Sequence, residues 1–396
     1  MSEIENRITG AVDGMRGEII AFLADLVRAK SVNPPGNTKA AIEVISAKLR
    51  SFGVEPEVVG PEEHNKSVLA RVGSKGGYEL VFNSHMDTVP IGEEKAWRVD
   101  PFGGQIIDDE LYGRGSADAK GCLAGMIMAA KALKEAGVEL KRGHLVLNPV
   151  GDEETLGLQG AKWILDQGLI RPDGVIIGEI TTNKIAIAHK GILWLKLVTH
   201  GRTAHASTPW EGVNAIDKMV DLLAAIRSEV GTRLAARRHP LTPPPSMNLG
   251  IINGGVKTNV VADRCEAIID RRLLPNETVE DARQEFIEVI RKVQSKDPTF
   301  QAELEVIVTG SPLETAPDAE LTRVCQRAAR DLGLSDELVG YQQASDGRFF
   351  SERGIPTILI GPGIPELAHT PNEHVDVAGV VECTKFYALI AAKLLA

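Results

Sequence analysis

The chain has 396 residues, enough for two domains, and its 43% apolar and 25% charged content is ordinary for a soluble globular protein. A net charge of −10 disfavours nucleic acid or an anionic membrane as a partner, and no apolar run is long enough to span a bilayer. The scattered cysteines form no C-x-x-C pair and residues 1–6 have no signal character, so we expect a reduced, cytoplasmic protein. Any bound metal must then be held by histidines and carboxylates.

The first part of the chain alternates between apolar strands and amphipathic helices. Helical periodicity marks residues 18–28 and 38–52, with a proline-containing loop at 31–36 between them. Strands are predicted at 67–72, 78–82, 144–150 and 174–178, and helices at 121–134 and 160–167. This order predicts an α/β fold with a mostly parallel sheet sandwiched by helices, in which working residues collect at the carboxyl ends of strands.

The pattern changes near residue 190. Strands at 191–200, 246–252, 265–271 and 302–308 enclose helices at 214–229 and 282–296, in the order β-α-β-β-α-β. This order predicts an inserted ferredoxin-like α+β domain at 191–308. The α/β pattern then returns with a helix at 318–332, a strand at 357–360 and a helix at 377–395. We therefore expect one discontinuous domain, 1–190 and 309–396, interrupted by the insertion.

An acidic run, Asp152, Glu153 and Glu154, directly follows the predicted strand at 144–150. Adjacent carboxylates repel one another, so their pKa values rise unless a cation lies among them. Taken alone, such a run is more often a solvated acidic turn than a metal site. The preference for a metal has to come from the rest of the chain.

Further candidate ligands follow other predicted strands and turns. His85 and Asp87 come just after the strand at 78–82 and point the same way in extended backbone, so Asp87 is placed to orient a metal-binding imidazole. Asp118 lies in a glycine-rich turn whose spacing does not complete a dinucleotide-binding loop. Glu179 follows the strand at 174–178. Taken alone, His85 and Asp87 are better explained as a strand-end pair held for packing. Asp118 is also explained as an ordinary turn or N-cap residue, and Glu179 as a solvated strand end.

A late loop adds an imidazole, from His369 or from its competitor His374. Two divalent ions about 3.5–4 Å apart need a shared carboxylate plus roughly one imidazole and one carboxylate each. The candidates together match that inventory.

These residues fall in motifs that resemble those of the co-catalytic dizinc aminoacylase/carboxypeptidase G family. The resemblance covers essentially the whole chain, and residues 344–349 are similar to a stretch of the acetylornithine deacetylase and succinyl-diaminopimelate desuccinylase branch. It implies a zinc exopeptidase-like catalytic domain with an inserted lid and dimerisation domain. The motifs are His85-Met86-Asp87, Gly113-Arg114-Gly115-Ser116-Ala117-Asp118, Asp152-Glu153-Glu154, Gly178-Glu179 and His369-Thr370-Pro371-Asn372-Glu373.

The resemblance implies two bound divalent metal ions, zinc foremost, with cobalt and manganese as alternatives. The implied ligands share one carboxylate: Asp118 bridges both ions, His85 and Glu179 complete one, and Glu154 and His369 complete the other.

Two neighbouring residues are given other roles by the same resemblance. Glu153 would be the general base for the metal-bridging water, and Asp87 would orient His85. The peptide after Asp118 is typically cis in the family. Ile180 stands where family members often have proline, which leaves the ligand oxygen of Glu179 unaffected but alters the local turn.

The resemblance also assigns residues that bind the substrate. His205 would stabilise the oxyanion and reach the active site of the partner subunit, which implies a homodimer formed through the lid domain. Asn259 and Arg272 would hold the substrate carboxylate, since a guanidinium offers a fork of donors, while Arg271 should face the opposite side of the strand. Gly363 would offer backbone groups to the substrate.

The resulting hypothesis is a dizinc amidohydrolase that deacylates an N-acyl amino acid or a similar small molecule bearing a carboxylate. The alternative within this class is a metallo-dipeptidase or carboxypeptidase that releases an amino acid. An alternative of another class is a non-catalytic module that binds peptides or metal. The base beside a full ligand set disfavours the module, because simple binding needs no proton acceptor.

Overall fold

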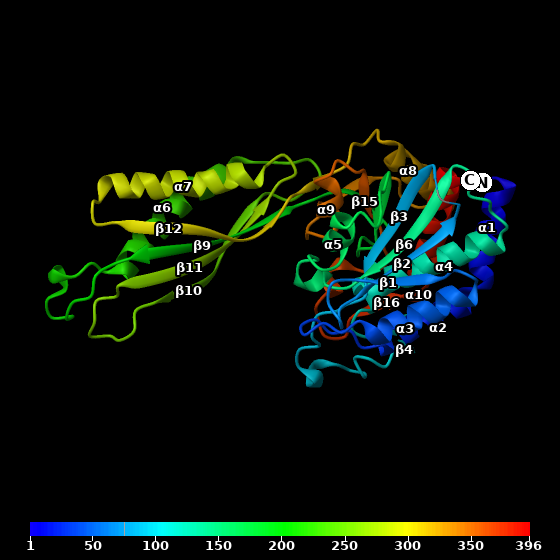
Figure 1. Cartoon of the computed structure of the whole chain (residues 1–396), viewed down its shortest axis with the longest axis horizontal. Helices are drawn as coiled ribbons and strands as arrows, with labels where there is room; N and C mark the ends of the chain where they lie inside the picture. Colours follow the sequence, from blue (N-terminus) through cyan, green and yellow to red (C-terminus); the bar gives the residue numbers. More distant parts are fainter. Residues whose placement is uncertain (75) are drawn as a thin grey trace. The chain divides into compact units, whose positions relative to one another are not determined.

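The computed structural model describes residues 1–74 and 76–396, and the chain is drawn in Figure 1. The described residues fold into two compact units. The first consists of Met1–Ile187, Thr315–Val339 and Ser345–Ala396, and the second of Ala188–Glu314 and Gly340–Ala344. The segment expected as an insertion, 191–308, lies within the second unit.

A mixed sheet, most of which belongs to the first unit, has the strand order β1-β2-β6-β3-β7-β15-β8-β13, with β14 paired to β8. The central strands β6, β3, β7 and β15 run parallel, and the strands towards both edges pair antiparallel. The α/β class is therefore confirmed, with the parallel part confined to the centre. The strands are β1 (Pro56–Val59), β2 (Ser67–Gly73), β3 (Tyr78–His85), β6 (Gly143–Val150), β7 (Gly174–Ile177), β8 (Ile185–His189), β13 (Leu313–Glu314), β14 (Leu338–Tyr341) and β15 (Thr357–Leu359).

Helices flank this sheet because its central strands are apolar on both faces (Figure 1). Every residue of β6 and β7 is buried. Helices α4 and α10 pack against β3 and β6, whereas α8 and α9 pack against β15. The helices are α1 (Glu3–Gly14), α2 (Arg16–Arg28), α3 (Lys39–Ser51), α4 (Gly121–Glu135), α5 (Ala161–Asp166), α8 (Glu320–Leu332), α9 (Gly347–Ser351) and α10 (Val377–Leu395).

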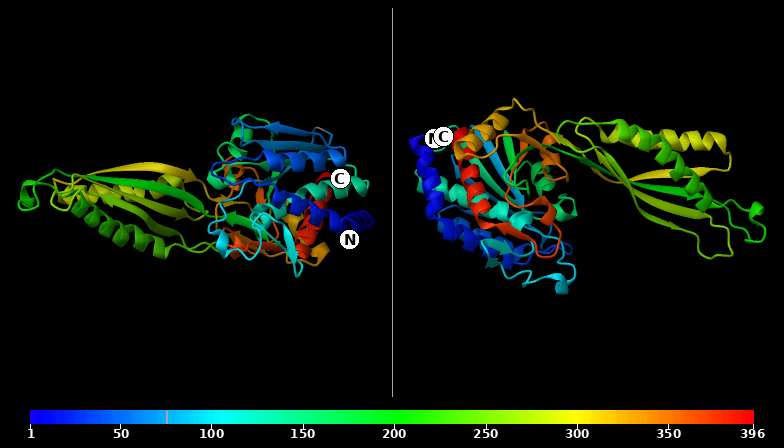
Figure 2. Two further views of the ribbon diagram at one scale, coloured as in Figure 1. Left: turned by 90° about the horizontal axis from the view of Figure 1, so that it is seen from below. Right: turned by 180° about the vertical axis from the view of Figure 1, so that it is seen from behind.

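The two ends of the chain lie side by side in this unit (Figure 2). Helix α1 packs on α10, and Lys393 of α10 forms ion pairs with Glu5 and, at 2.7 Å, with Asp331. A small sheet of order β16-β5-β4 joins two other segments that are far apart in the sequence. Its strands are β4 (Gln105–Ile107), β5 (Glu110–Tyr112) and β16 (His374–Asp376). This small sheet matters for the site because it fixes the segment before residue 374 next to the segment after residue 112.

The second unit is an antiparallel sheet of order β10-β11-β9-β12 with two helices on one face (Figure 1). Alternate residues of β11 point into a core shared with both helices, which is why this strand shows alternating burial. The order of strands and helices is that of a ferredoxin-like fold. The elements are β9 (Gly191–His200), α6 (Ala215–Ala236), β10 (Ser246–Gly254), β11 (Arg264–Leu273), α7 (Val279–Lys296) and β12 (Gln301–Gly310).

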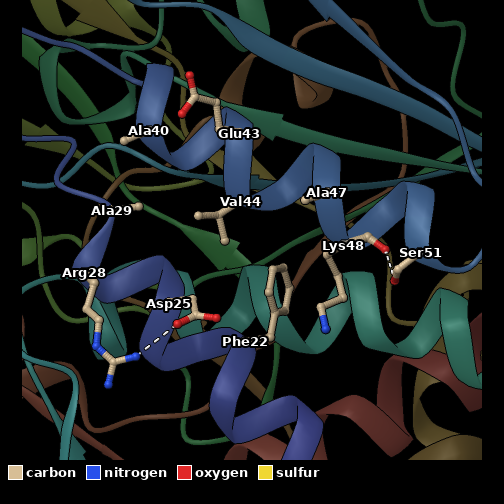
Figure 3. A pocket seen from close by; sticks show the side chains of 10 residues that line it. All are labelled: Phe22, Asp25, Arg28, Ala29, Ala40, Glu43, Val44, Ala47, Lys48 and Ser51. Carbon is tan, nitrogen blue, oxygen red and sulfur yellow. Dashed lines mark hydrogen bonds and ion pairs between the residues drawn. The ribbon is translucent and has the colours of Figure 1, made fainter.

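The four cysteines are free and buried. Within the described residues, no helix has both the length and the apolar character needed to cross a membrane. A groove of about 590 Å³ lies between α2 and α3 and is lined in part by Phe22, Val44 and an ion pair of Arg28 with Asp25 (Figure 3). Its lining contains none of the candidate ligands, so we assign it no part in the chemistry.

Candidate metal centre

The parallel centre of the sheet brings three of the singled-out segments to one edge. In the register of β3 with β6, His85 lies opposite Val150, and in that of β3 with β7, Asn83 lies opposite Ile177. The acidic turn after β6 and the glutamate after β7 therefore start at the level where β3 ends in a histidine. This is the carboxyl edge, where open α/β sheets place their ligands.

Two triads of potential metal ligands share Asp118. One ligand atom from each of His85, Asp118 and Glu179 lies within 4.8 Å of the other two, and the same holds for Asp118, Glu154 and His369. The Asp118 oxygens face different histidines, with His85 Nε2 3.1 Å from Oδ1 and His369 Nε2 3.3 Å from Oδ2. His369 Nε2 is also 3.2 Å from Oε2 of Glu154. A carboxylate divided in this way has the geometry of a bridging ligand.

The electrostatics of the site fit bound cations. Hydrogen bonds to Asp118 and Glu154 raise the pKa of His369 to about 10, and burial raises the pKa of Glu154 above its usual range. Burial opposes ionisation of Asp118, yet His369 and His85 hold the pKa of that carboxyl well below its ordinary value. In the protein alone, protons on the imidazoles thus balance the carboxylates. Divalent ions would replace those protons, and this mixed nitrogen and oxygen donor set suits zinc, cobalt or manganese.

Asp87 supports the site in a different way from the one expected. The Nδ1–H group of His85 donates to the main-chain carbonyl of Asp87 at 2.9 Å, while the nearer carboxylate oxygen is 3.7 Å away. The other oxygen, Oδ2, accepts from Nδ2 of Asn33 at 2.9 Å and from the backbone N–H of Glu154 at 3.2 Å. Asp87 therefore holds residues of both triads. Asn33 was missed from sequence, and the Asn-Pro-Pro run that contains it was the only signal.

Glu153 is carried by a turn with an unusual backbone. The turn Glu153–Thr155 is flanked by Asp152 and Leu156, which are both left-handed at φ 78° and 89°. The Asp152 carboxylate fixes it by accepting from Thr155 Oγ1 at 2.6 Å and from the backbone N–H of Gln159 at 2.9 Å. Burial raises the pKa of Glu153 well above its usual range, although the nearby His85 opposes the shift. Glu153 is thus a half-buried residue whose carboxyl has a raised pKa, beside the triads and outside both of them.

The remaining candidates of the first unit are also placed. The Asp118–Ala119 peptide is cis. Gly363 has φ +95°, and a Cβ added there would lie 3.1 Å from Cβ of Ala117 and 3.2 Å from Cγ2 of Ile180. The competitor His374 is 2.6 Å from Glu110 and contacts the Tyr112 ring, so it is engaged elsewhere.

His205, Asn259 and Arg272 belong to the second unit. His205 is exposed, pairs through its backbone with Val260 next to Asn259, and has Nδ1 2.7 Å from Ser207 Oγ. Arg272 is partly exposed and forms a two-point ion pair with Asp270.

Its neighbour Arg271 is fully buried, with a guanidinium nitrogen 2.5 Å from Glu277. Arg271 is therefore committed to the interior of the second unit, as strand alternation predicted. Of these two adjacent arginines, only Arg272 has a partly exposed side chain.

Known proteins share both the sequence and the fold of this chain. The model of peptidase family M20/M25/M40 matches residues 81–393. An acetylornithine deacetylase of Pectobacterium carotovorum is 34% identical over 330 residues, which is 82% of each chain. A putative aminohydrolase of methicillin-resistant Staphylococcus aureus superimposes with a TM-score of 0.80 at 19% identity, covering 99% of this chain and 100% of that one.

A Bacillus subtilis protein described as a dinuclear metal binding peptidase of the M20 family has a TM-score of 0.73 at 16% identity and covers 97% of this chain and 99% of that one. Fold and site together define a metal-dependent hydrolase that acts on amide bonds. The chain belongs to the peptidase family M20/M25/M40.

Proposed function

We propose that this chain is a deacylase that hydrolyses the amide bond of an N-acyl amino acid, with two divalent ions, zinc foremost, held by the two triads. The observation that carries the proposal is the Asp118 carboxylate, whose two oxygens face one histidine of each triad. Similarity to acetylornithine deacetylases over 82% of the chain supports this substrate class.

The chemistry divides between the ions and the protein. Bound ions would lower the pKa of water and polarise the amide carbonyl. Glu153 takes the proton of the attacking water and passes it to the leaving nitrogen, a role for which a carboxyl of raised pKa is suited. Asp87 keeps His85 and Glu154 in place through its carbonyl and carboxylate.

Residues of the second unit complete the proposed reaction. His205 donates to the oxyanion that develops on the amide oxygen, and it does so in the active site of the partner subunit. Asn259 and Arg272 bind the substrate carboxylate, for which Arg272 exchanges its ion pair with Asp270. Backbone groups at Gly363 contact the substrate. A cytoplasmic location stays a prediction from sequence.

A homodimer through the second unit is part of the proposal. The edge strand β10 is mostly exposed, and Ile251, Ile252 and the adjoining Val256 are 49%, 47% and 86% exposed. An exposed edge with apolar side chains is a surface suited to pairing with a second copy. Sedimentation equilibrium tests this point: the native chain should be a dimer and Ile252→Glu a monomer.

The test of function is a hydrolysis screen. Enzyme loaded with zinc, cobalt or manganese is assayed for amine release from N-acetyl, N-succinyl and N-formyl amino acids, and from dipeptides. Turnover of N-acyl amino acids above that of dipeptides supports the deacylase. Preference for dipeptides would replace it by a peptidase, and inertness of metal-loaded protein towards every amide would favour a binding module.

A further inference from the structure

We propose that Glu373 is a positioning residue that locks the shared ligand Asp118 in register with His369. The inference rests on the ligand set of the proposed function and assigns a role to the last residue of the motif that begins at His369. Glu373 itself belongs to neither triad.

The carboxylate of Glu373 is saturated by donors from the Asp118 loop. Its Oε1 accepts from the backbone N–H groups of Ala117 and Asp118, each at 3.0 Å. Its Oε2 accepts from Nη1 of Arg114 at 2.6 Å, and the carbonyl of Glu373 accepts from the backbone N–H of Gly113 at 2.9 Å. The side chain is 0% exposed, so these bonds have no competition from water. Glu373 thus makes four hydrogen bonds to the loop that carries Asp118.

The hydrogen bonds from Glu373 hold a segment whose backbone is not regular helix. Asp118 has φ −114° and ψ 91° inside a π-helical segment, Ser116–Lys120, and therefore departs from helical geometry at the ligand itself. Its N–H group is held by Glu373 instead of a helical carbonyl. The direction of the Asp118 carboxylate depends on the orientation of the peptide that carries this N–H group. Glu373 therefore orients the ligand that the two triads share.

Residues on both sides of these hydrogen bonds, Arg114 and Asn372, have further contacts that hold them in place. The Arg114 guanidinium is buried and lies over the Trp97 ring at 5.2 Å. On the other side, Asn372 accepts from the backbone N–H of Arg98 at 2.6 Å and donates to the carbonyl of Ala96 at 3.0 Å. The segment that starts with His369 is therefore fastened to the same part of the chain as the Asp118 loop. This fastening fixes the distance between the shared ligand and the imidazole of one triad.

The chemistry of the donors requires a carboxylate. Two peptide N–H groups and a guanidinium converge on one side chain, and an ionised carboxylate is the only side chain that offers acceptors alone at both oxygens. A glutamine amide would present donors to Arg114 or to the peptide groups. Glu373→Gln therefore conserves the shape of the side chain but disrupts these hydrogen bonds. Glu373→Asp shortens the side chain and keeps its charge.

The test measures metal affinity without substrate. Apo protein is titrated with zinc against a chromophoric chelator, and bound equivalents are counted by elemental analysis. We expect Glu373→Gln to bind zinc roughly 10–100-fold more weakly than the native chain, as changes to residues that orient ligands do. At saturating zinc kcat should fall while KM stays unchanged. Glu373→Asp should recover part of the affinity and serves as the test variant if Glu373→Gln fails to fold.

A matched control lies in the second unit. Glu277 pairs with the buried Arg271 at 2.5 Å and accepts the backbone N–H of Leu274 at 2.6 Å, so Glu277→Gln breaks the same kind of contact away from the ligands. Its metal affinity should equal that of the native chain. Native affinity in both Glu373 variants, or an equal loss in Glu277→Gln, would overturn the inference. Failure of the native chain to bind two equivalents would instead count against the proposed function.

Discussion

The role of proton acceptor proposed for Glu153 rests on its surroundings. Burial raises its pKa well above its usual range, and it stands beside both triads without being a member of either. Its neighbour Glu154 faces His369 at 3.2 Å and is a member of one triad. The roles proposed for these adjacent glutamates therefore differ because only Glu154 is a member of a triad.

Replacing Glu153 by glutamine separates these tasks. Glu153→Gln should retain two metal equivalents and lose about 10²–10⁴-fold in kcat, because the proton acceptor is gone while the ligands remain. The measurement is turnover of the best substrate from the screen together with elemental analysis of the same sample. Near-native turnover with metals bound would disprove the assignment of the base.

Asp346 provides a test based on pH. Burial raises the pKa of this carboxyl to about 6, and both of its oxygens are buried and make no hydrogen bond to described residues. Because the pKa in the folded state lies above the unfolded value of roughly 3.9, the folded state binds more protons between these values, and its free energy of unfolding falls as pH rises through that window. Below about pH 4 this loss is absent.

Asp346→Asn should remove the fall in the free energy of unfolding that ionisation of Asp346 causes. In metal-free protein we expect the variant to be more stable than the native chain above pH 6, by up to about 3 kcal/mol, and to lose this advantage towards pH 4. Urea unfolding at pH 4 and pH 7.5 gives the two differences. Equal differences at both pH values would show that the Asp346 carboxyl does not titrate as described.

The sequence predicted the candidate ligands better than the hydrogen bonds that hold them in place. His85, Asp118, Glu154, Glu179 and His369 were named from motifs and family resemblance, and the structure brings them together. Their roles stay proposals. The bonds from Asn33 to Asp87 and from Glu373 to the Asp118 loop join residues far apart in sequence, so no local pattern encodes them.

At the scale of elements, the turn after β6 is held from outside. Arg348 donates to the carbonyls of Ser345 and Leu156, at 3.0 and 2.5 Å, and so ties α9 to this turn. At Gly157, with φ +65°, an added Cβ would lie 2.0 Å from Oδ1 of Asp346. The turn that carries Glu153 is therefore packed against α9 with no room for one more carbon.

Two alanine substitutions test this packing. Gly168 has nearly the same backbone, φ +64°, but open space where its Cβ would be, so Gly168→Ala should lose only the roughly 1–2 kcal/mol of a left-handed residue. Gly157→Ala should lose more stability and also lower kcat, because the turn must shift. Chemical denaturation and turnover of both variants decide the matter. Equal losses of stability and unchanged kcat would contradict the tight fit.

Strongly patterned elements were the predictable ones. The apolar runs of β6 and β7 and the long, largely apolar sequences of α4 and α10 gave boundaries within one or two residues of those observed. Helix α1, which is mostly polar, and the short β1 and β8 were not expected. The antiparallel edge strands β13 and β14 and the small β16-β5-β4 sheet were also not predicted, since strands of two to five residues depend on partners supplied by the fold.

For the whole molecule, the two units should respond differently to metal. Both triads lie entirely in the first unit. A ligand that binds only the folded state stabilises it by roughly 2.7 kcal/mol at one hundred times its Kd. Two compact units also make a single two-state transition a poor description of unfolding.

Calorimetry with and without a chelator tests this expectation. Removal of metal should lower the melting temperature of the first unit by several degrees and leave that of the second unit in place. Activity should disappear with the chelator and return when zinc or cobalt is restored. A thermogram that does not change on chelation would argue against bound metal in the native protein.

The chain order of the triads has a consequence for biosynthesis. His85, Asp118 and Glu179 leave the ribosome before most of the second unit, whereas His369 follows it, as does β15, which enters the sheet between β7 and β8. Between them most of the second unit is made as one continuous stretch, which can fold as soon as it emerges. Because both triads share Asp118, and the N–H group of Asp118 is held by Glu373, neither triad would be complete before residues 369–373 are made, and the nascent chain would stay catalytically silent until then.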